Sequence, residues 1–362
     1  MNTEINTQAP TEKQIKSVEN AIDHFKNGKM VIIVDDEGRE NEGDIALPAQ
    51  DCKPEDINFM ATVARGLICT PLDGSIIDNL DLEPMVTQNT ESMGTAFTVS
   101  VDASNDIESG ISAKDRSNTV KKLANKNSSK SDFVKPGHIF PLRYQNGGVL
   151  VRAGHTEGSV DLVKLSGKIP AAVICEVMNE DGRMARLDDL HKFAIKHKIK
   201  IASIEDIIAY RLRNEKFVYK ASSKDIKINK NDLLDFSIYK SKISKNNNYV
   251  IIKGKISSNK LLRVRVISTM LKNSKSVFQN SKVKQSLKYL SKHTNFALII
   301  INNENMKDKF ENENITLRYY GIGAQIIKDL RIKNMILVTR TKKKIIGLEG
   351  FGLKIKKQEI IK

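Results

Sequence analysis

The net charge of this 362-residue chain changes sign near residue 213. Residues 1–212 hold 25 Lys and Arg against 32 Asp and Glu, which is a net charge of −7. The rest of the chain holds 34 against 11, which is +23, and the two parts sum to the whole-chain charge of +16. So large a change of composition along one chain indicates two domains, and 362 residues are enough for two hydrophobic cores.

The domain boundary is expected where the chain becomes lysine-rich and loses its hydrophobic periodicity. That stretch covers residues 214–234, which we predict to be a linker between a first domain at residues 1–213 and a second at residues 235–362. In the second domain the lysines are scattered among Asn, Ile and Ser with few aromatic residues between them. This pattern favours a biased background composition over a nucleic-acid-binding surface.

No feature of the sequence predicts a membrane-spanning or secreted protein. No stretch approaches the roughly 20 apolar residues that a membrane-spanning helix needs, and residues 1–13 are polar without the apolar core of a signal peptide. Cys52, Cys69 and Cys175 provide neither a disulfide framework nor a close metal-binding spacing. We therefore expect a cytoplasmic protein in a reducing compartment.

Helix and strand patterns are mixed in both halves without the regular spacing of βαβ units, so we expect an α+β fold for both domains. A buried strand is expected at Met30–Val34, directly before the most acidic stretch of the chain. The expected helices span 15–25 (ended by Gly28), 112–123 (opened by Ser112 and Asp115) and 203–213, and one more starts at Gly321. The other expected strands are 95–103, 147–152 (ending in a glycine-flanked turn), 249–256, 261–268, 296–302 and 335–340.

The acidic stretch DDEGRENEGD directly follows the strand expected at Met30–Val34 and admits two interpretations. Six carboxylates in ten residues form either a solvated loop or a site where a cation offsets their repulsion. If the segment is extended, Glu40, Glu42 and Asp44 project from one face, which suits a hard oxygen-liganded cation such as Mg²⁺. Arg39 beside them offers a fork of donors for a phosphate. Taken alone, the segment fits the solvated loop better.

Two further segments offer chemically capable groups. His155 stands in RAGHTEG among Arg152, Gly154 and Thr156, which is the composition of an anion or metal site, whereas the other histidines lie in ordinary surroundings. Glu176 closes the apolar run AAVIC, where a buried carboxylate needs a partner and is a candidate general acid or base. Together with the acidic stretch, these residues suggest a divalent-metal site for a small phosphorylated and hydroxylated substrate.

Seven motifs resemble, in order, the signatures of 3,4-dihydroxy-2-butanone-4-phosphate synthase, an enzyme of riboflavin biosynthesis. The resemblance covers roughly residues 15–212 and departs from the family pattern at Gly38 and at 158–159, positions that touch no presumed ligand. The motifs are DDEGRENEGD, ARGLICTPL, TAFTVSVDA, GISAKDRSNTV, PGHIFPL, GGVLVRAGHTEGSVDL and CEVMNEDGRMARLDDL.

The resemblance implies a lyase that converts D-ribulose 5-phosphate to 3,4-dihydroxy-2-butanone 4-phosphate and formate. It implies one or two Mg²⁺ or Mn²⁺ ions per site, with Glu40 and His155 as ligands, and a homodimer with its sites at the subunit interface. Glu42, Asp44 and Glu176 are candidates for the base, and this alternative stays open. The implied catalytic residues are Glu40, Glu42, Asp44, His155 and Glu176. The implied substrate contacts are Arg39, Glu40, Asp44, Arg152, Ala153, Gly154, His155, Thr156 and Glu176. Supporting positions are Cys69, Ser112, Asp115, Arg116, Thr119 and His138.

The second half resembles GTP cyclohydrolase II, most clearly over Leu317–Ile355, and Thr339 and Lys344 match nucleotide-contacting positions of that family. That family holds catalytic zinc with three cysteines, yet no cysteine follows Cys175. We therefore expect no zinc and a domain that keeps the fold without the hydrolase activity. Two alternatives are a bifunctional enzyme in which other ligands rescue GTP hydrolysis, and a basic binding module for nucleic acid or a partner enzyme.

Overall fold

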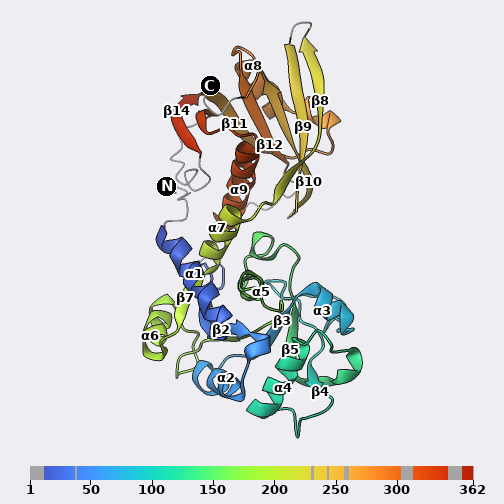
Figure 1. Cartoon of the computed structure of the whole chain (residues 1–362), viewed down its shortest axis with the longest axis vertical. Coiled ribbons are helices and arrows are strands. Elements are labelled where there is room, and N and C mark those ends of the chain that lie inside the picture. Colours follow the sequence, from blue (N-terminus) through green and yellow to red (C-terminus); the bar gives the residue numbers. More distant parts are fainter. Residues whose placement is uncertain are drawn as a thin grey trace. The chain divides into compact units, whose positions relative to one another are not determined.

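The computed structural model describes residues 12–36, 39–229, 232–242, 244–256, 261–302, 313–340 and 353–361 (Figure 1). Its contacts divide the chain into one compact unit at Glu12–Ile208 and a second that begins at Ala209. Each unit contains one seven-stranded sheet with helices. The α+β class expected from the sequence is confirmed for both. Within the described residues, no helix has the length and apolar character needed to cross a membrane.

The sheet of the first unit has the strand order β4-β5-β3-β6-β2-β1-β7 and mixes parallel with antiparallel pairs. Its strands are β1 (Val31–Val34), β2 (Gly43–Pro48), β3 (Cys69–Leu72), β4 (Val101–Ala103), β5 (Phe133–Arg143), β6 (Ala172–Glu176) and β7 (Lys200–Ser203). Its helices are α1 (Glu12–Lys26), α2 (Pro54–Phe59), α3 (Gly74–Asn79), α4 (Ala113–Leu123), α5 (His155–Leu165), α6 (Leu187–His197) and the first part of α7 (Ile204–Asn214). Short turns of other helix types occur at Ala49–Asp51, Met60–Ala64, Lys130–Asp132 and Gly148–Leu150.

Both faces of the central strands are covered, which is why β1 and β2 are fully buried. Successive side chains of a strand point to opposite faces. Ile32 accordingly packs into a core cluster that includes Leu190 of α6, whereas Ile33 faces Gly158 of α5. This double burial fixes the β1–β2 hairpin, and with it the acidic loop that joins the two strands.

Several expected elements agree with the structure. α1 buries Val18, Ala21, Ile22 and Phe25 on one face, and the chain leaves it through Gly28 at a φ of +63°. The side chain of Ser112 accepts the backbone N–H of Asp115 and begins α4 as the capping pattern predicts. The carboxylate of Asp115 also accepts the N–H groups of residues 109 and 110.

Two predicted strands of the first unit are wrong or too long. Residues 147–152 do not form a strand, because Gly147 and Gly148 adopt φ values of +99° and +63° and open a short 3₁₀ turn. A Cβ on Gly148 would lie 2.3 Å from the buried carboxylate of Asp161, so this close approach requires glycine. The strand expected at 95–103 is regular only over β4, with isolated bridges at Phe97 and Thr98.

The sheet of the second unit has the order β14-β13-β11-β12-β10-β9-β8. Its strands are β8 (Val218–Asn229), β9 (Asp232–Ser241), β10 (Ser244–Lys253), β11 (Leu262–Thr269), β12 (Phe296–Asn302), β13 (Asn334–Thr339) and β14 (Lys354–Ile360). Its helices are α8 (Ser281–Leu290) and α9 (Glu313–Asp329), with a 3₁₀ turn at Lys275–Val277.

The linker expected at 214–234 is largely strand. β8 pairs antiparallel with β9 along nearly its whole length, so backbone pairing orders a segment whose lysine-rich sequence lacks a clear apolar period. The helix expected to start at Gly321 begins instead at Glu313.

Candidate active site

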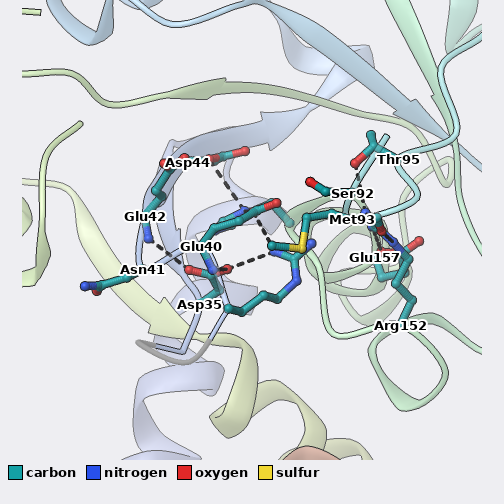
Figure 2. Close-up of polar contacts among 12 residues, drawn as sticks. Asp35, Glu40, Asn41, Glu42, Asp44, Ser92, Met93, Thr95, Arg152 and Glu157 are labelled. Atoms are coloured by element: carbon teal, nitrogen blue, oxygen red, sulfur yellow. Dashed lines mark hydrogen bonds and ion pairs between the residues drawn. The ribbon is translucent and has the colours of Figure 1, made fainter. Parts of the chain in front are cut away.

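The acidic loop between β1 and β2 is organised by the carboxylate of Asp35. One oxygen accepts the backbone N–H of Glu42 at 2.9 Å, and the other accepts the N–H of Glu40 at 3.2 Å and Nη1 of Arg39 at 2.8 Å (Figure 2). The Asp35 side chain is only 1% exposed. Like charges crowd this loop without unfolding it because its own backbone and Arg39 supply the donors.

The loop is not extended, so the expected row of three carboxylates on one face is wrong. Arg39 and Glu40 lie in a turn, and Asn41 takes a left-handed φ of +55° before β2 begins. Glu40 therefore faces α5, whereas Glu42 lines a cavity of about 390 Å³ and lies 3.9 Å from Nη1 of Arg186. Burial raises the pKa of Glu42.

The structure brings Glu40 and His155 together although 115 positions separate them. Oε2 of Glu40 lies 3.5 Å from Nδ1 of His155, which is the first residue of α5 and is buried. The contact with His155 and the charge of Arg39 hold the pKa of Glu40 below its usual range, against the effect of burial. Burial disfavours the charged form of His155, yet the neighbouring carboxylates of Asp44 and Glu40 raise its pKa overall.

A second pair of carboxylates lies beside this contact. Asp44 and Glu176 are directly opposite each other on the antiparallel strands β2 and β6. Oδ1 of Asp44 lies 3.7 Å from Nδ1 of His155, and burial raises the pKa of Asp44 to about 7. The N–H of Leu67 donates to Glu176 at 2.8 Å, and a Cβ on Gly66 would clash with the Glu176 backbone.

Arg39 and Arg152 converge at Gly154, the residue that precedes α5. A Cβ at Gly154 would lie 2.5 Å from Nη1 of Arg152 and 3.1 Å from Nη2 of Arg39. Ala153 lies in the turn before Gly154, and Thr156 is buried in the first turn of α5. Two guanidinium groups at the N-terminus of a helix form a favourable environment for a phosphate.

The donor set at Asp35, Glu40 and His155 fits a divalent cation. One ligand atom from each of these residues lies within 4.8 Å of the other two. Among the described residues, Nε2 of His155 and Oδ1 of Asp44 are buried polar atoms without a hydrogen-bond partner. Two carboxylates and one imidazole suit Mg²⁺ or Mn²⁺, and the orphaned atoms are the kind that a bound group satisfies.

Asp35 is a possible ligand that the alternating pattern of Glu40, Glu42 and Asp44 does not predict. A usable signal was its place as the first residue after a buried strand, where a side chain is held by rigid scaffold.

Most of the supporting positions lie on α4 or beside it. Nδ1 of His138 lies 2.6 Å from Oδ2 of Asp102, and the Thr119 hydroxyl accepts the N–H of Ala103. Nε of Arg116 is buried without a partner among the described residues. Cys69 is buried on β3, and burial raises the pKa of its thiol well above the usual range, which fits a packing role.

Comparison with known proteins agrees with this geometry. A family model described as 3,4-dihydroxy-2-butanone 4-phosphate synthase matches residues 19–210, more than half of the chain. The chain belongs to this family. A second model, GTP cyclohydrolase II, matches residues 220–360. Both resemblances inferred from the sequence are therefore confirmed.

Relatives of the synthase family match the chain over nearly its whole length. The riboflavin biosynthesis protein RibBA of Endomicrobium trichonymphae is 40% identical over 96% of this chain and 92% of its own. A 3,4-dihydroxy-2-butanone 4-phosphate synthase of Wolinella succinogenes is 38% identical over 96% and 97%.

Two crystal structures extend the comparison to three dimensions. RibBX, a two-domain 3,4-dihydroxy-2-butanone 4-phosphate synthase from A. baumannii, covers 94% of this chain and 99% of its own with a TM-score of 0.79 and 34% identity. A synthase in complex with two magnesium ions is 42% identical with a TM-score of 0.52, over 54% of this chain and 97% of its own.

The described residues of the cyclohydrolase-like unit include no donor set comparable to Asp35, Glu40 and His155. All three cysteines of the chain lie in the first unit. Thr339 ends β13 with a buried hydroxyl that has no partner among the described residues, whereas Lys344 and most of INNENMKDKF lie outside them.

Proposed function

We propose that the chain is a Mg²⁺-dependent lyase that converts D-ribulose 5-phosphate to 3,4-dihydroxy-2-butanone 4-phosphate and formate. As a member of the synthase family it is an enzyme of riboflavin biosynthesis. The observation that supports the proposed chemistry most directly is the meeting of Glu40 and His155 beside two further carboxylates.

Glu40 and His155 would hold the cation, with Asp35 as a third donor. When bound, Mg²⁺ or Mn²⁺ supplies positive charge at the ketone oxygen of the sugar, where negative charge develops once the neighbouring proton is removed. Asp35 also fixes the loop backbone, so Glu40 is oriented before any ligand arrives.

Asp44 and Glu176 are the proposed proton-transfer groups. Burial raises the pKa of Asp44 well above its usual range, toward neutral pH, which suits a group that exchanges a proton with the substrate. Glu176 is directly across the strand pair and is oriented by the N–H of Leu67. One carboxylate can therefore accept a carbon-bound proton while the other donates a proton to, or accepts one from, a hydroxyl of the sugar.

Arg39, Arg152, Thr156 and the N-terminus of α5 would bind the phosphate. The lack of a side chain at Gly154 lets both guanidinium groups approach the same point. The first N–H groups of a helix have no intrahelical acceptor and favour an anion. Phosphate binding at this end would fix the sugar with its ketone beside Glu40 and His155.

We further propose that the protein is a homodimer, which the resemblance to the synthase family also implies. Leu67 is 45% exposed although its N–H contacts Glu176, and Ile111 and Val134 are 53% and 48% exposed in the same unit. A second copy would cover apolar surface next to the site. Light scattering of the purified protein tests this: a monomer at micromolar concentration contradicts it.

The second unit, in our proposal, does not hydrolyse GTP. A thiolate zinc site is impossible there because no cysteine follows Cys175. The decisive experiment incubates the full-length protein separately with ribulose 5-phosphate and with GTP, each with Mg²⁺ or Zn²⁺, and follows formate. We expect formate from ribulose 5-phosphate with Mg²⁺ and none from GTP. Formate from GTP alone would reverse the proposal, and formate from both would make the enzyme bifunctional.

A further inference from the structure

Arg152 is held in place by contacts on both sides of its guanidinium group. On one side, Nη1 donates to Oε2 of Glu157 at 2.6 Å. On the other, Nε and Nη2 donate to the carbonyl of Met93, and Nη2 donates to the Thr95 hydroxyl at 2.9 Å. Figure 2 shows these residues grouped at one side of the acidic loop.

Glu157 is suited to orient a cationic side chain. It lies in the first turn of α5, two residues after His155, and its side chain is 1% exposed. Its second carboxylate oxygen accepts the N–H of Gln145 at 3.1 Å, so the carboxylate is fixed before it contacts Arg152. A buried charge held at both oxygens restricts its partner to one orientation.

A count of donors shows what this orientation leaves available. An arginine has five N–H donors, and the contacts to Glu157, Met93 and Thr95 use four of them. The remaining hydrogen is on Nη1, the atom that would lie 2.5 Å from a Cβ at Gly154. The free donor of Arg152 is therefore next to the N-terminus of α5.

The loop on the other side of Arg152 is also ordered by its own contacts. Glu91 accepts the N–H groups of Met93 and Thr95 at 2.8 and 2.7 Å, and Asn89 donates to the Thr95 carbonyl. These bonds present the Met93 carbonyl and the Thr95 hydroxyl to Arg152 in a fixed geometry. The loop thus acts as a second support for the guanidinium group.

We propose that Glu157 is a positioning residue for the substrate's phosphate: with Thr95 and the Met93 carbonyl it fixes Arg152 so that one Nη1 donor faces the anion site at the start of α5. This rests on the proposed function, in which Arg152 binds the phosphate of a sugar phosphate. Glu157 does not touch the substrate. It acts through Arg152, which without it is a long flexible side chain that must be ordered at each binding event.

The test compares Glu157→Ala and Glu157→Gln with wild type by steady-state kinetics with ribulose 5-phosphate and by calorimetric binding of inorganic phosphate. For Glu157→Ala we expect KM to rise about 10-fold or more, a smaller fall in kcat, and a parallel loss of phosphate affinity. Glu157→Gln can keep an acceptor oxygen for Nη1 but turns its amide toward the N–H of Gln145, so its KM should rise less than that of Glu157→Ala. Thr95→Val should give an intermediate rise.

Asp161→Asn is the matched control. Asp161 is an equally buried carboxylate one turn along α5, and it accepts the Tyr144 hydroxyl and the N–H of Val149. We expect a lower melting temperature with unchanged KM and phosphate affinity.

Unchanged KM and phosphate affinity in a folded Glu157→Ala protein would overturn the proposal, as would equal effects of Asp161→Asn. If Glu157→Ala does not fold, a large KM effect in Glu157→Gln with no effect in Thr95→Val also overturns it. Failure of the proposed function is a separate result, because wild type itself would then release no formate, whereas phosphate binding is measured without turnover.

Discussion

The two units differ in the polar groups that lie at the ends of their buried strands. In the first unit, Asp35, Asp44 and Glu176 lie at the ends of β1, β2 and β6, and Asp35 and Asp44 lie close to His155. In the second unit, Thr339 ends β13, and Arg265 of β11 is buried against Ser286 and the Val338 carbonyl. The first set contains carboxylates and an imidazole that can bind a metal, whereas the described residues of the second unit include no comparable cluster of ligands. A sheet can therefore persist where its ligands do not.

The largest expected effect comes from removing a proposed ligand in the first unit. We expect Glu40→Gln or His155→Ala to lower formate release from ribulose 5-phosphate on the order of 10³-fold or more. Circular dichroism should show an intact fold, because both side chains lie at the site rather than in the core. Near-normal turnover in either folded variant would contradict the ligand assignment.

Chelation should produce a comparable but reversible loss. Treatment with EDTA followed by dialysis is expected to abolish formate release, and Mg²⁺ or Mn²⁺ should restore it. Full activity after thorough chelation, verified by metal analysis, would rule out the proposed cation.

A smaller loss is expected from Gly154→Ala. The new Cβ would meet Nη1 of Arg152 at 2.5 Å and displace the guanidinium groups, which should lower kcat/KM about 10- to 100-fold. Gly158→Ala is the control on the same helix, because its Cβ would make ordinary contacts of 3.4 Å or more. A similar loss in both variants would show that helix α5 responds to any added bulk.

The smallest effect on activity is expected in the second unit. Ile299 is fully buried on β12, and Ile299→Ala should destabilise that unit by about 2–5 kcal/mol in thermal unfolding. Formate release at a temperature below the transition should stay unchanged. A parallel loss of activity would contradict this prediction and show that the second unit supports the first.

The sequence predicted which of the proposed site residues lie together better than it predicted the local structure around them. The family motifs brought Glu40, His155, Asp44 and Glu176 together, and the coordinates place them within one cluster. Periodicity identified α1, which buries one apolar face, and apolar runs identified β10, β11, β12 and β13 of the second unit. The sequence did not predict β8, β9 or β14.

Local conformation at the loops was predicted poorly because backbone contacts from distant residues decide it. A helix begins at His155, where we expected a turn because the nearby glycines resemble turn residues. The sequence does not show that Asp161 of this helix accepts the N–H of Val149. Alternation in the acidic stretch failed for a similar reason: the left-handed Asn41 and the carboxylate of Asp35 bend it.

The double use of Asp35 limits how this loop can vary in evolution. Its oxygens already accept two backbone N–H groups and a guanidinium hydrogen, and one of them is close enough to Glu40 and His155 to reach the same ion. Even asparagine, of nearly identical shape, would turn an amide donor toward groups that are themselves donors. In the proposed site, selection for loop shape and selection for ion affinity would act on a single side chain, and a substitution there would fail both at once.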